Sequence, residues 1–285
     1  MVVESLLNVN QTKKNPKKAF FIGFLYSILG LSLALWVFPS RSSITSVFFT
    51  SMAAIPFITL VLISEEKEDE DHLKKGEKLF IDGHVDVFLV YLYIFLGLVV
   101  GFTFLFAVLP QNVVNTAFED QISTINTIRG NPSTGNVPNT GALLRIVSNN
   151  LKVLFFTLLF SFIYGTGAIF ILTWNASVIS VAIGDLIRLG LNSAGFSAIS
   201  VIPLSFLRYF VHGIPEIGAY FLGGIAGGIL STALIRSELN KKYFKKIVID
   251  ILDLIILAIL LLFVAGIIEV MISPYINPLI FVKKV

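Results

Sequence analysis

The sequence has no cysteine among its 285 residues, and only 14% of its residues are charged. The absence of cysteine excludes disulfide bridges, thiolate metal sites and cysteine nucleophiles. The charged fraction is well below the roughly one quarter found in soluble domains. With 55% apolar residues and a mean hydropathy of +0.87, the composition excludes a soluble enzyme, a coiled coil and a disordered chain. It indicates an integral membrane protein.

Apolar stretches long enough to cross a bilayer fill almost the whole chain. We therefore predict an all-α, polytopic transmembrane helix bundle with about seven crossings. One crossing is expected to be broken or re-entrant, because polar residues and Pro203 interrupt its apolar sequence. The predicted crossings are 19–38, 46–63, 87–109, 151–174, the broken region 175–211, 213–235 and 247–272.

Charged and polar stretches between the crossings suggest three parts. Residues 1–109 form an N-terminal transmembrane part with three crossings and a charged cytoplasmic loop, 64–86. Residues 110–148, rich in Asn, Thr, Gly and Pro, are expected to be an extracytoplasmic loop. Residues 149–285 form a second transmembrane part, which we treat as the core.

Basic residues predict the orientation of the chain. Thirteen of the 21 Lys and Arg residues fall in three short segments, 13–18, 64–86 and 236–246. Because basic loops stay in the cytoplasm, we predict a multi-pass plasma-membrane protein with a cytoplasmic N-terminus and an extracytoplasmic C-terminus. Lys283 and Lys284 do not fit this pattern, because they would lie on the extracytoplasmic side. The basic excess is an orientation signal, so we expect no nucleic-acid partner.

Polar side chains inside predicted crossings are candidates for function, because the membrane tolerates them only at a cost. Pro215 suits the first turn of a helix, which would place Glu216 near the start of the sixth crossing. Amide, imidazole and carboxyl groups from three stretches would then lie near the extracytoplasmic face. This predicted polar cluster consists of Asn149, Asn150, His212, Glu216 and Glu269.

Three interpretations of the predicted polar cluster remain open. It could be an interhelical hydrogen-bond network that fixes the packing of the bundle. It could bind a divalent cation or move protons. It could also line a groove that holds a partner protein or a lipid.

Secondary candidates lie in the broken region and in glycine pairs. Asp185 and Arg188 are three residues apart, so on a helix they share a face, either as a structural pair or facing a cavity. Asn175 is a further candidate. Glycines four residues apart let helix backbones approach closely. The glycines expected to serve helix packing are Gly165, Gly167, Gly223, Gly224, Gly227 and Gly228.

Catalytic motifs are not found in the sequence. There is no HExxH, no GxSxG, no P-loop and no pair of histidines on one helix face, and the chain has three histidines in all. We therefore expect no enzymatic activity, no bound metal and no cofactor.

Short motifs between Asn149 and Pro274 form a set. They are the Asn149-Asn150 pair, Gly165 and Gly167, Leu172-x-x-Asn175, His212-Gly213-x-x-Glu216 followed by Gly223 and Gly227, and Ile268-Glu269 with Pro274. As a set they resemble the stage II sporulation protein M family. The opening Asn15-Pro16 and the stretch from Phe20 to Phe38-Pro39 are similar to the family's longer, archaeal-type members. Ala176 departs from the pattern, which usually has Gly after the Asn.

The resemblance implies a membrane scaffold, which in spore-forming bacteria holds peptidoglycan-cleaving partners at the membrane during engulfment. It also implies that Asn150, Asn175, His212, Glu216 and Glu269 matter, without assigning them a chemical role. We therefore expect a scaffold or assembly factor that contacts the lipid bilayer and a membrane or extracytoplasmic protein, with a homo-oligomer as a further alternative. The alternative functions are a transporter of small molecules, ions or lipids, and a metal-dependent intramembrane hydrolase.

Overall fold

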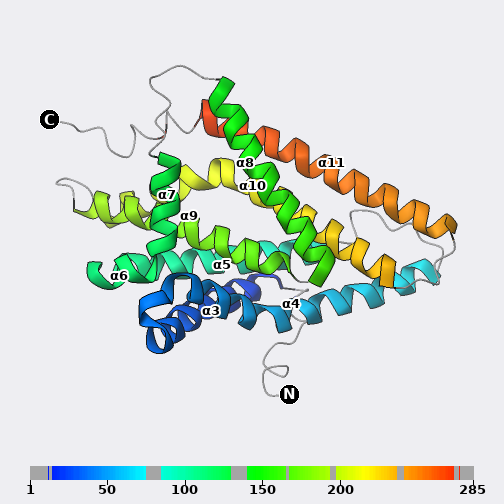
Figure 1. The fold of residues 1–285 in the computed structure, drawn as a ribbon, viewed down its shortest axis with the longest axis horizontal. Helices are drawn as coiled ribbons and strands as arrows, with labels where there is room; N and C mark the ends of the chain where they lie inside the picture. Colours follow the sequence, from blue (N-terminus) through cyan, green and yellow to red (C-terminus); the bar gives the residue numbers. More distant parts are fainter. Residues whose placement is uncertain are drawn as a thin grey trace. The chain divides into compact units, whose positions relative to one another are not determined.

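The computed structural model describes residues 12, 15–74, 85–129, 140–164, 167–192, 197–235, 241–272 and 276. Within these residues every regular element is a helix (Figure 1). The elements are α3 (Lys17–Val37), the short 3-10 helix η1 (Pro39–Arg41), α4 (Ser42–Lys74), α5 (Val85–Val108), α6 (Gln111–Ala117), α7 (Glu119–Arg129), α8 (Thr140–Tyr164), α9 (Ala168–Leu191), α10 (Ala198–Ile235) and α11 (Lys241–Met271).

Seven stretches of the described helices are long and apolar enough to cross a membrane. This confirms the predicted all-α transmembrane fold, and the number of crossings agrees with the prediction. The stretches are Lys17–Val37, Pro39–Val61, Phe88–Val108, Leu143–Ile163, Ala168–Leu191, Ala198–Ser231 and Ile247–Met271.

The predicted limits of the fourth crossing, 151–174, are wrong. Helix α8 begins at Thr140 and ends at Tyr164, and α9 begins at Ala168. The chain turns around Gly167, where a β-carbon would meet the backbone carbonyl of Phe160. Only the three residues Gly165-Thr166-Gly167 interrupt the apolar sequence here, so hydropathy averaged over about 20 residues does not reveal the turn.

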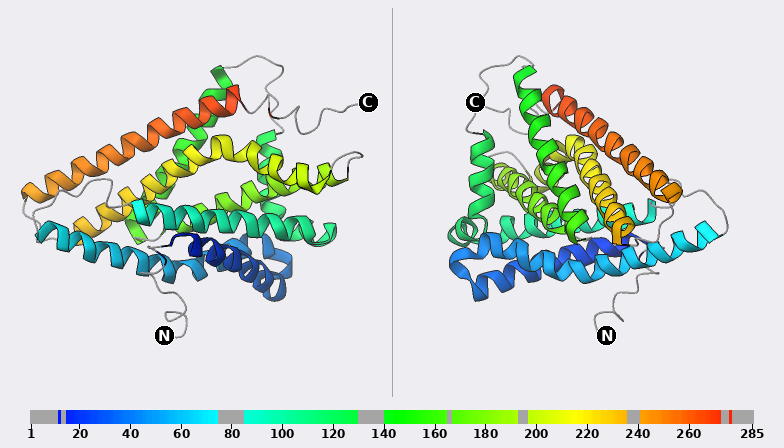
Figure 2. Two further views of the ribbon diagram at one scale, coloured as in Figure 1. Left: turned by 180° about the vertical axis from the view of Figure 1, so that it is seen from behind. Right: turned by 45° about the vertical axis from the view of Figure 1, so that its right-hand side comes forward.

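The region 175–211, predicted to be one broken crossing, holds the end of one crossing and the start of the next, so the interruption lies between two helices and not within one. Helix α9 continues to Leu191, and α10 begins at Ala198. Helix α10 then runs through Pro203 and Pro215 to Ile235, so Pro215 does not start a helix. Membrane helices tolerate internal proline, and α10 bends along its length (Figure 2). Proline produces such bends because it removes one backbone hydrogen bond.

The predicted loop 110–148 is partly helical. It contains α6, α7 and the first turns of α8. Phe118 lies between α6 and α7, and its buried ring makes edge contacts with the rings of Phe102 and Phe106 on α5. These aromatic contacts fix the segment against the end of α5.

The chain divides into two compact units, Met1–Ile122 with Thr173–Ser180, and Ser123–Leu172 with Val181–Val285. In the first unit, α3 packs against α4 and α5. A β-carbon at Gly97 would meet the backbone of Phe20 and Phe24, and one at Gly101 would meet Ser27. The contacting positions advance together along both helices, so α3 and α5 are parallel.

In the second unit, α8, α10 and α11 pack side by side (Figure 1). A β-carbon at Gly223 would lie 2.5 Å from Leu154 Cδ1, and one at Gly227 would lie 2.9 Å from Ser161 Cβ. Helices α8 and α10 are therefore parallel. Gly266 near the end of α11 faces Leu143 near the start of α8, so α11 is antiparallel to both.

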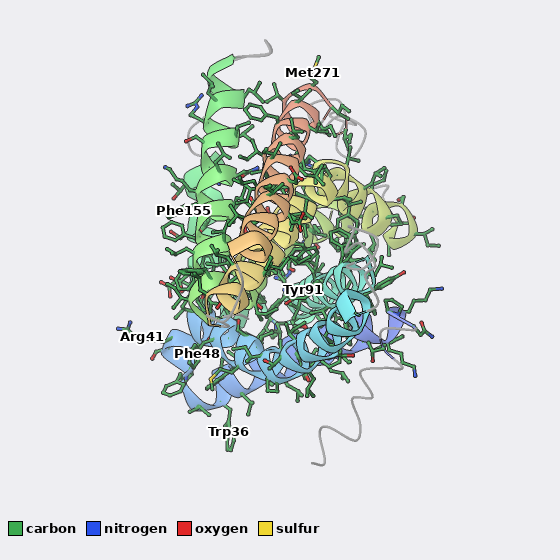
Figure 3. The ribbon with its side chains drawn as sticks, turned by 90° about the vertical axis from the view of Figure 1, so that its right-hand side faces the viewer. Trp36, Arg41, Phe48, Tyr91, Phe155 and Met271 are labelled. Atoms are coloured by element: carbon green, nitrogen blue, oxygen red, sulfur yellow. The ribbon has the colours of Figure 1, made fainter. Side chains whose placement is uncertain are left out.

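Large apolar side chains remain exposed on the membrane-length helices. Trp36, Phe48 and Phe155 are 81%, 50% and 59% exposed, and they point away from the helices that carry them (Figure 3). Tyr91, in contrast, is buried. In an apolar chain these exposed side chains are the surfaces that contact lipid.

Candidate functional site

The second unit brings together three members of the predicted polar cluster. Asn150 is buried on α8, and Glu216 on α10 and Glu269 on α11 are half-buried. Asn149, beside Asn150, is exposed. Asn150 does not open its helix as predicted, because α8 begins ten residues earlier at Thr140.

Glu216 is the centre of this cluster. The hydroxyl of Tyr220 donates a hydrogen bond of 2.8 Å to Glu216 Oε1. The Asn150 side chain forms a second hydrogen bond with the same carboxyl group, and Glu269 is close enough for its charge to interact with Glu216. Three helices are thus connected by polar groups, a contact type that stabilises helix packing where lipid offers no hydrogen bonds.

The position of Glu216 along its helix differs from the prediction. It lies within the long α10, next to Pro215, rather than at a helix start. The positive end of a helix dipole therefore does not stabilise its charge.

Glu269 lies in the last turn of α11, whose final residue Met271 is exposed at the end of the helix (Figure 3). The cluster consequently sits near the end of one crossing.

His212 lies one helical turn before Glu216 on the same face of α10. Its ring makes an edge contact with Tyr209 at 6.1 Å between centroids, and the positive charge of Arg208 acts on it. The Arg208 guanidinium lies 5.5 Å from the Tyr209 ring centroid, within the range of a cation–π contact. His212 therefore lies beside the cation–π pair of Arg208 and Tyr209.

Two residues of this site were missed from the sequence. Tyr220 reads as an ordinary aromatic residue in an apolar helix, and Arg208 lies in the region predicted to be broken. The spacing of four residues from Glu216 to Tyr220 was a usable signal, because residues four apart on a helix are neighbours. A long regular helix had to be assumed before that spacing could be used.

The secondary candidates belong to different units of the chain. Asn175 is half-buried on the part of α9 that belongs to the first unit. Asp185 and Arg188 are half-buried, one turn apart on the part of α9 that belongs to the second unit. The continuous helix places this pair on one face, as expected for a spacing of three residues.

The predicted packing glycines have different surroundings. Gly223, Gly224 and Gly227 face α8 or the start of α9, and Ser161 on α8 donates a 2.6 Å hydrogen bond to the carbonyl oxygen of Gly224. Gly167 lies in the turn between α8 and α9. Gly228 is half-buried, and Gly165 lies outside the described residues.

A second polar cluster, also missed from the sequence, lies in the first unit. The fully buried Gln121 on α7 accepts a 2.7 Å hydrogen bond from Ser43 and donates one of 3.2 Å to Ser177 on α9. Ser43 also accepts a bond from the backbone N–H of Asp120, and Ser177 donates to the Trp174 carbonyl. This cluster ties α4, α7 and α9 together.

The side chains of these clusters are held together by hydrogen bonds. Among the residues whose structure is described, no three His, Asp or Glu side chains gather in a way that could hold a metal ion. Glu216, Tyr220 and Asn150 instead offer hydrogen-bond donors and acceptors to one another and to a neighbouring group.

Comparison with known proteins identifies the family to which the chain belongs. The family model described as Stage II sporulation protein M matches residues 80–274. Searches of curated proteins and of solved structures gave no match. The match begins at residue 80 rather than at Asn149, where we expected the resemblance to start, so it includes α5, α6 and α7 as well as the polar cluster of α8, α10 and α11. Because the matched segment covers more than half of the chain, this multi-pass membrane protein belongs to the stage II sporulation protein M family.

Proposed function

We propose that this protein is a membrane scaffold, without catalytic chemistry of its own, that holds a partner protein at the plasma membrane. The observation that carries the proposal is the polar cluster of Asn150, Glu216, Tyr220 and Glu269, built by three tightly packed helices near the end of α11. Family membership supports a shared membrane architecture of this kind.

The packing of α8 against α10 supports a rigid platform. Gly223 and Gly227 allow the two backbones to approach, and the bond from Ser161 to the Gly224 carbonyl joins them. A platform of fixed shape loses little conformational entropy when a partner binds. Half-buried carboxyl groups near a helix end offer the partner a negatively charged, hydrogen-bonding contact.

The transporter or lipid-handling alternative rested on non-helical backbone in region 175–211. The described part of that region is regular helix on both sides of residues 193–196, so this motivation is weaker. The hydrolase alternative needs a metal site, and the described residues offer no set of three ligands. The scaffold is therefore the function that we propose.

We further propose that the N-terminus is cytoplasmic and the C-terminus extracytoplasmic. If all seven candidate stretches cross the membrane, the three basic segments would lie on one side of it, which supports this orientation. The polar cluster near the end of α11 would then face the extracytoplasmic side, and the partner would be a membrane or extracytoplasmic protein. The opening Asn15-Pro16 motif supports a place among the archaeal-type members.

Affinity purification from native membranes tests the scaffold. We expect mild crosslinking of the wild type to retain a reproducible partner, and Glu216→Gln to lose it, because glutamine keeps the shape of the side chain but removes its charge. Mass spectrometry of the retained proteins, lipids and metals identifies what is lost.

Asp253→Asn is the matched control. Asp253 is exposed on α11, far along the helix from Glu269, so this variant should retain the partner. If the wild type retains no partner, the scaffold proposal loses its support. A lipid or metal that is retained by the wild type and lost by Glu216→Gln would favour one of the two alternatives.

A further inference from the structure

The outer face of α8 carries polar side chains within a stretch of helix that is long and apolar enough to cross a membrane. Four of them follow one another at intervals of three, one and three residues, so they lie on one side of the helix. All four are exposed, whereas the neighbouring Asn150 is buried. We call these four residues the α8 polar stripe: Arg145, Ser148, Asn149 and Lys152.

The neighbouring helix α11 indicates the depth of the α8 polar stripe in the membrane. A β-carbon at Gly266 on α11 would lie 3.0 Å from side-chain atoms of both Leu143 and Val147 on α8. The exposed side chains of α11 on both sides of this contact are apolar, namely Leu260, Phe263, Val264, Ile267 and Met271. Lipid tails therefore surround α11 at the level where the stripe begins on α8.

The length of α8 leads to the same conclusion. The helix ends at Tyr164, 12 residues after Lys152. Twelve helical residues span about 18 Å, whereas the hydrocarbon core of a bilayer is about 30 Å thick. A membrane boundary at Lys152 would therefore leave α8 too short to cross. Charged groups at hydrocarbon depth are costly unless a group of opposite charge accompanies them.

The charge of the α8 polar stripe selects an anionic ligand. Arg145 and Lys152 are cationic, and α8 contains no Asp or Glu. Arg145 Nε donates a 3.1 Å hydrogen bond to the Gly141 carbonyl oxygen, a bond that does not use the two terminal nitrogens of the guanidinium. Helical side chains lean toward the start of their helix, so the Lys152 ammonium can approach the level of Ser148 and Asn149. Two cations with a hydroxyl and an amide between them suit a phosphate group.

Beyond Lys152, the outer face of α8 is bulky and apolar. Phe155, Phe156 and Ile163 are 59%, 47% and 54% exposed, and Phe155 points away from its helix (Figure 3). The small side chains Thr157 and Ser161 are instead buried, and Ser161 hydrogen-bonds to α10. Because transmembrane helices associate through small residues, the outer face suits flexible acyl chains better than a further helix.

We propose that the α8 polar stripe binds the phosphate group of an anionic phospholipid, whose acyl chains lie along Phe155, Phe156 and Ile163. The phosphate supplies the negative charge that Arg145 and Lys152 need at this depth. A zwitterionic lipid carries its own cation beside the phosphate, so it neutralises the stripe less well. The stripe lies on the exposed side of α8, away from the buried Asn150, so this inference does not rest on the proposed scaffold role.

Native mass spectrometry of the purified full-length protein tests the site. The protein is delipidated in detergent and incubated with equal amounts of phosphatidylglycerol and phosphatidylcholine that carry the same acyl chains. We expect the wild type to retain phosphatidylglycerol in preference. Arg145→Gln and Lys152→Gln should each lower this preference about fivefold, as expected for the loss of one cation near an anionic lipid. The double variant should abolish it.

Arg41→Gln is the matched control. Arg41 is an exposed cation in η1, between two crossings and outside the α8 polar stripe, so this variant should keep the preference. Exchanging the two cations, Arg145→Lys with Lys152→Arg, preserves both charges and should also keep it. Circular dichroism checks that each variant is folded.

Three results would overturn the proposal. The first is an equal lipid preference in the wild type and the double variant. The second is a loss in Arg41→Gln as large as that in the double variant, because any surface cation would then serve. The third is a wild type without lipid preference that retains an acidic membrane protein which the double variant loses, because the stripe would then bind a protein.

Discussion

At the scale of single residues, buried amide side chains connect helices that are distant in the sequence. Gln121 is fully buried, and its bonds to Ser43 and Ser177 span 78 and 56 residues. Asn150 does the same for Glu216 in the second unit. An amide has both donors and an acceptor, so one side chain can satisfy hydroxyl groups on two other helices.

Replacing Gln121 tests this role. We expect Gln121→Leu to lower the free energy of unfolding by about 1–3 kcal/mol, because it leaves the Ser43 and Ser177 hydroxyls without their shared partner. Thermal and denaturant unfolding in detergent, followed by circular dichroism, measures the change. Asn126→Leu, at an exposed position on the same helix, is the control and should change stability by less than about 0.5 kcal/mol. Equal effects of the two variants would contradict the role of Gln121.

At the scale of helices, glycines decide which faces can meet. Gly227 has the backbone of Leu158 and Phe162 where a β-carbon would lie, whereas Gly218 has only Leu261 Cδ1 at 3.7 Å. Both are helical positions of α10, so their local conformations are alike. Close backbone approach is therefore required at one position and not at the other.

The two glycines make a matched pair for mutation. Gly227→Ala should destabilise the protein by about 1–3 kcal/mol, because the methyl group would force α8 and α10 apart. Gly218→Ala should leave stability unchanged or raise it by up to about 1 kcal/mol, since alanine is the better helix former. Unfolding in detergent compares the two. A Gly227→Ala variant as stable as Gly218→Ala would show that the helices do not need this close approach.

At the scale of the whole molecule, the helix directions agree with the order of seven crossings. Crossings one and three, α3 and α5, are parallel within the first unit. Crossings four and six, α8 and α10, are parallel within the second, and crossing seven, α11, is antiparallel to them. A chain that reverses direction at each crossing has this pattern of parallel and antiparallel helices. The observed limits of crossings four to six therefore remain compatible with the orientation that the basic segments predict.

The absence of cysteine allows a direct test of that orientation. Ser40 in η1 and Ser123 on α7 are exposed and fall on the predicted extracytoplasmic side. In intact cells, Ser40→Cys and Ser123→Cys should react with a membrane-impermeant maleimide. Lys241→Cys, in the basic segment 236–246, should react only after the membrane is permeabilised. The reverse pattern would invert the orientation, and the wild type, without a thiol, gives the background.

The sequence by itself determined the membrane environment, the helical class and the number of crossings. Each of these depends on hydropathy summed over about 20 residues, a local quantity that requires no knowledge of neighbouring helices. Polar residues in such segments stand out for the same reason, so Asn150, Glu216 and Glu269 were found without a structure. The turn around Gly167 was not, because the short Gly165-Thr166-Gly167 interruption hardly changes a hydropathy sum taken over about 20 residues.

Only the tertiary structure decided which polar groups meet. Tyr220 and Arg208 could be assigned to the site only because α10 is continuous through Pro203 and Pro215. A regular helix places residues four apart on one face. Glu269 reaches Glu216 because α11 packs against α10. Gln121 meets Ser43 and Ser177 through packing between distant segments. Such contacts depend on the positions of two or three helices at once, and no single stretch of sequence contains that information.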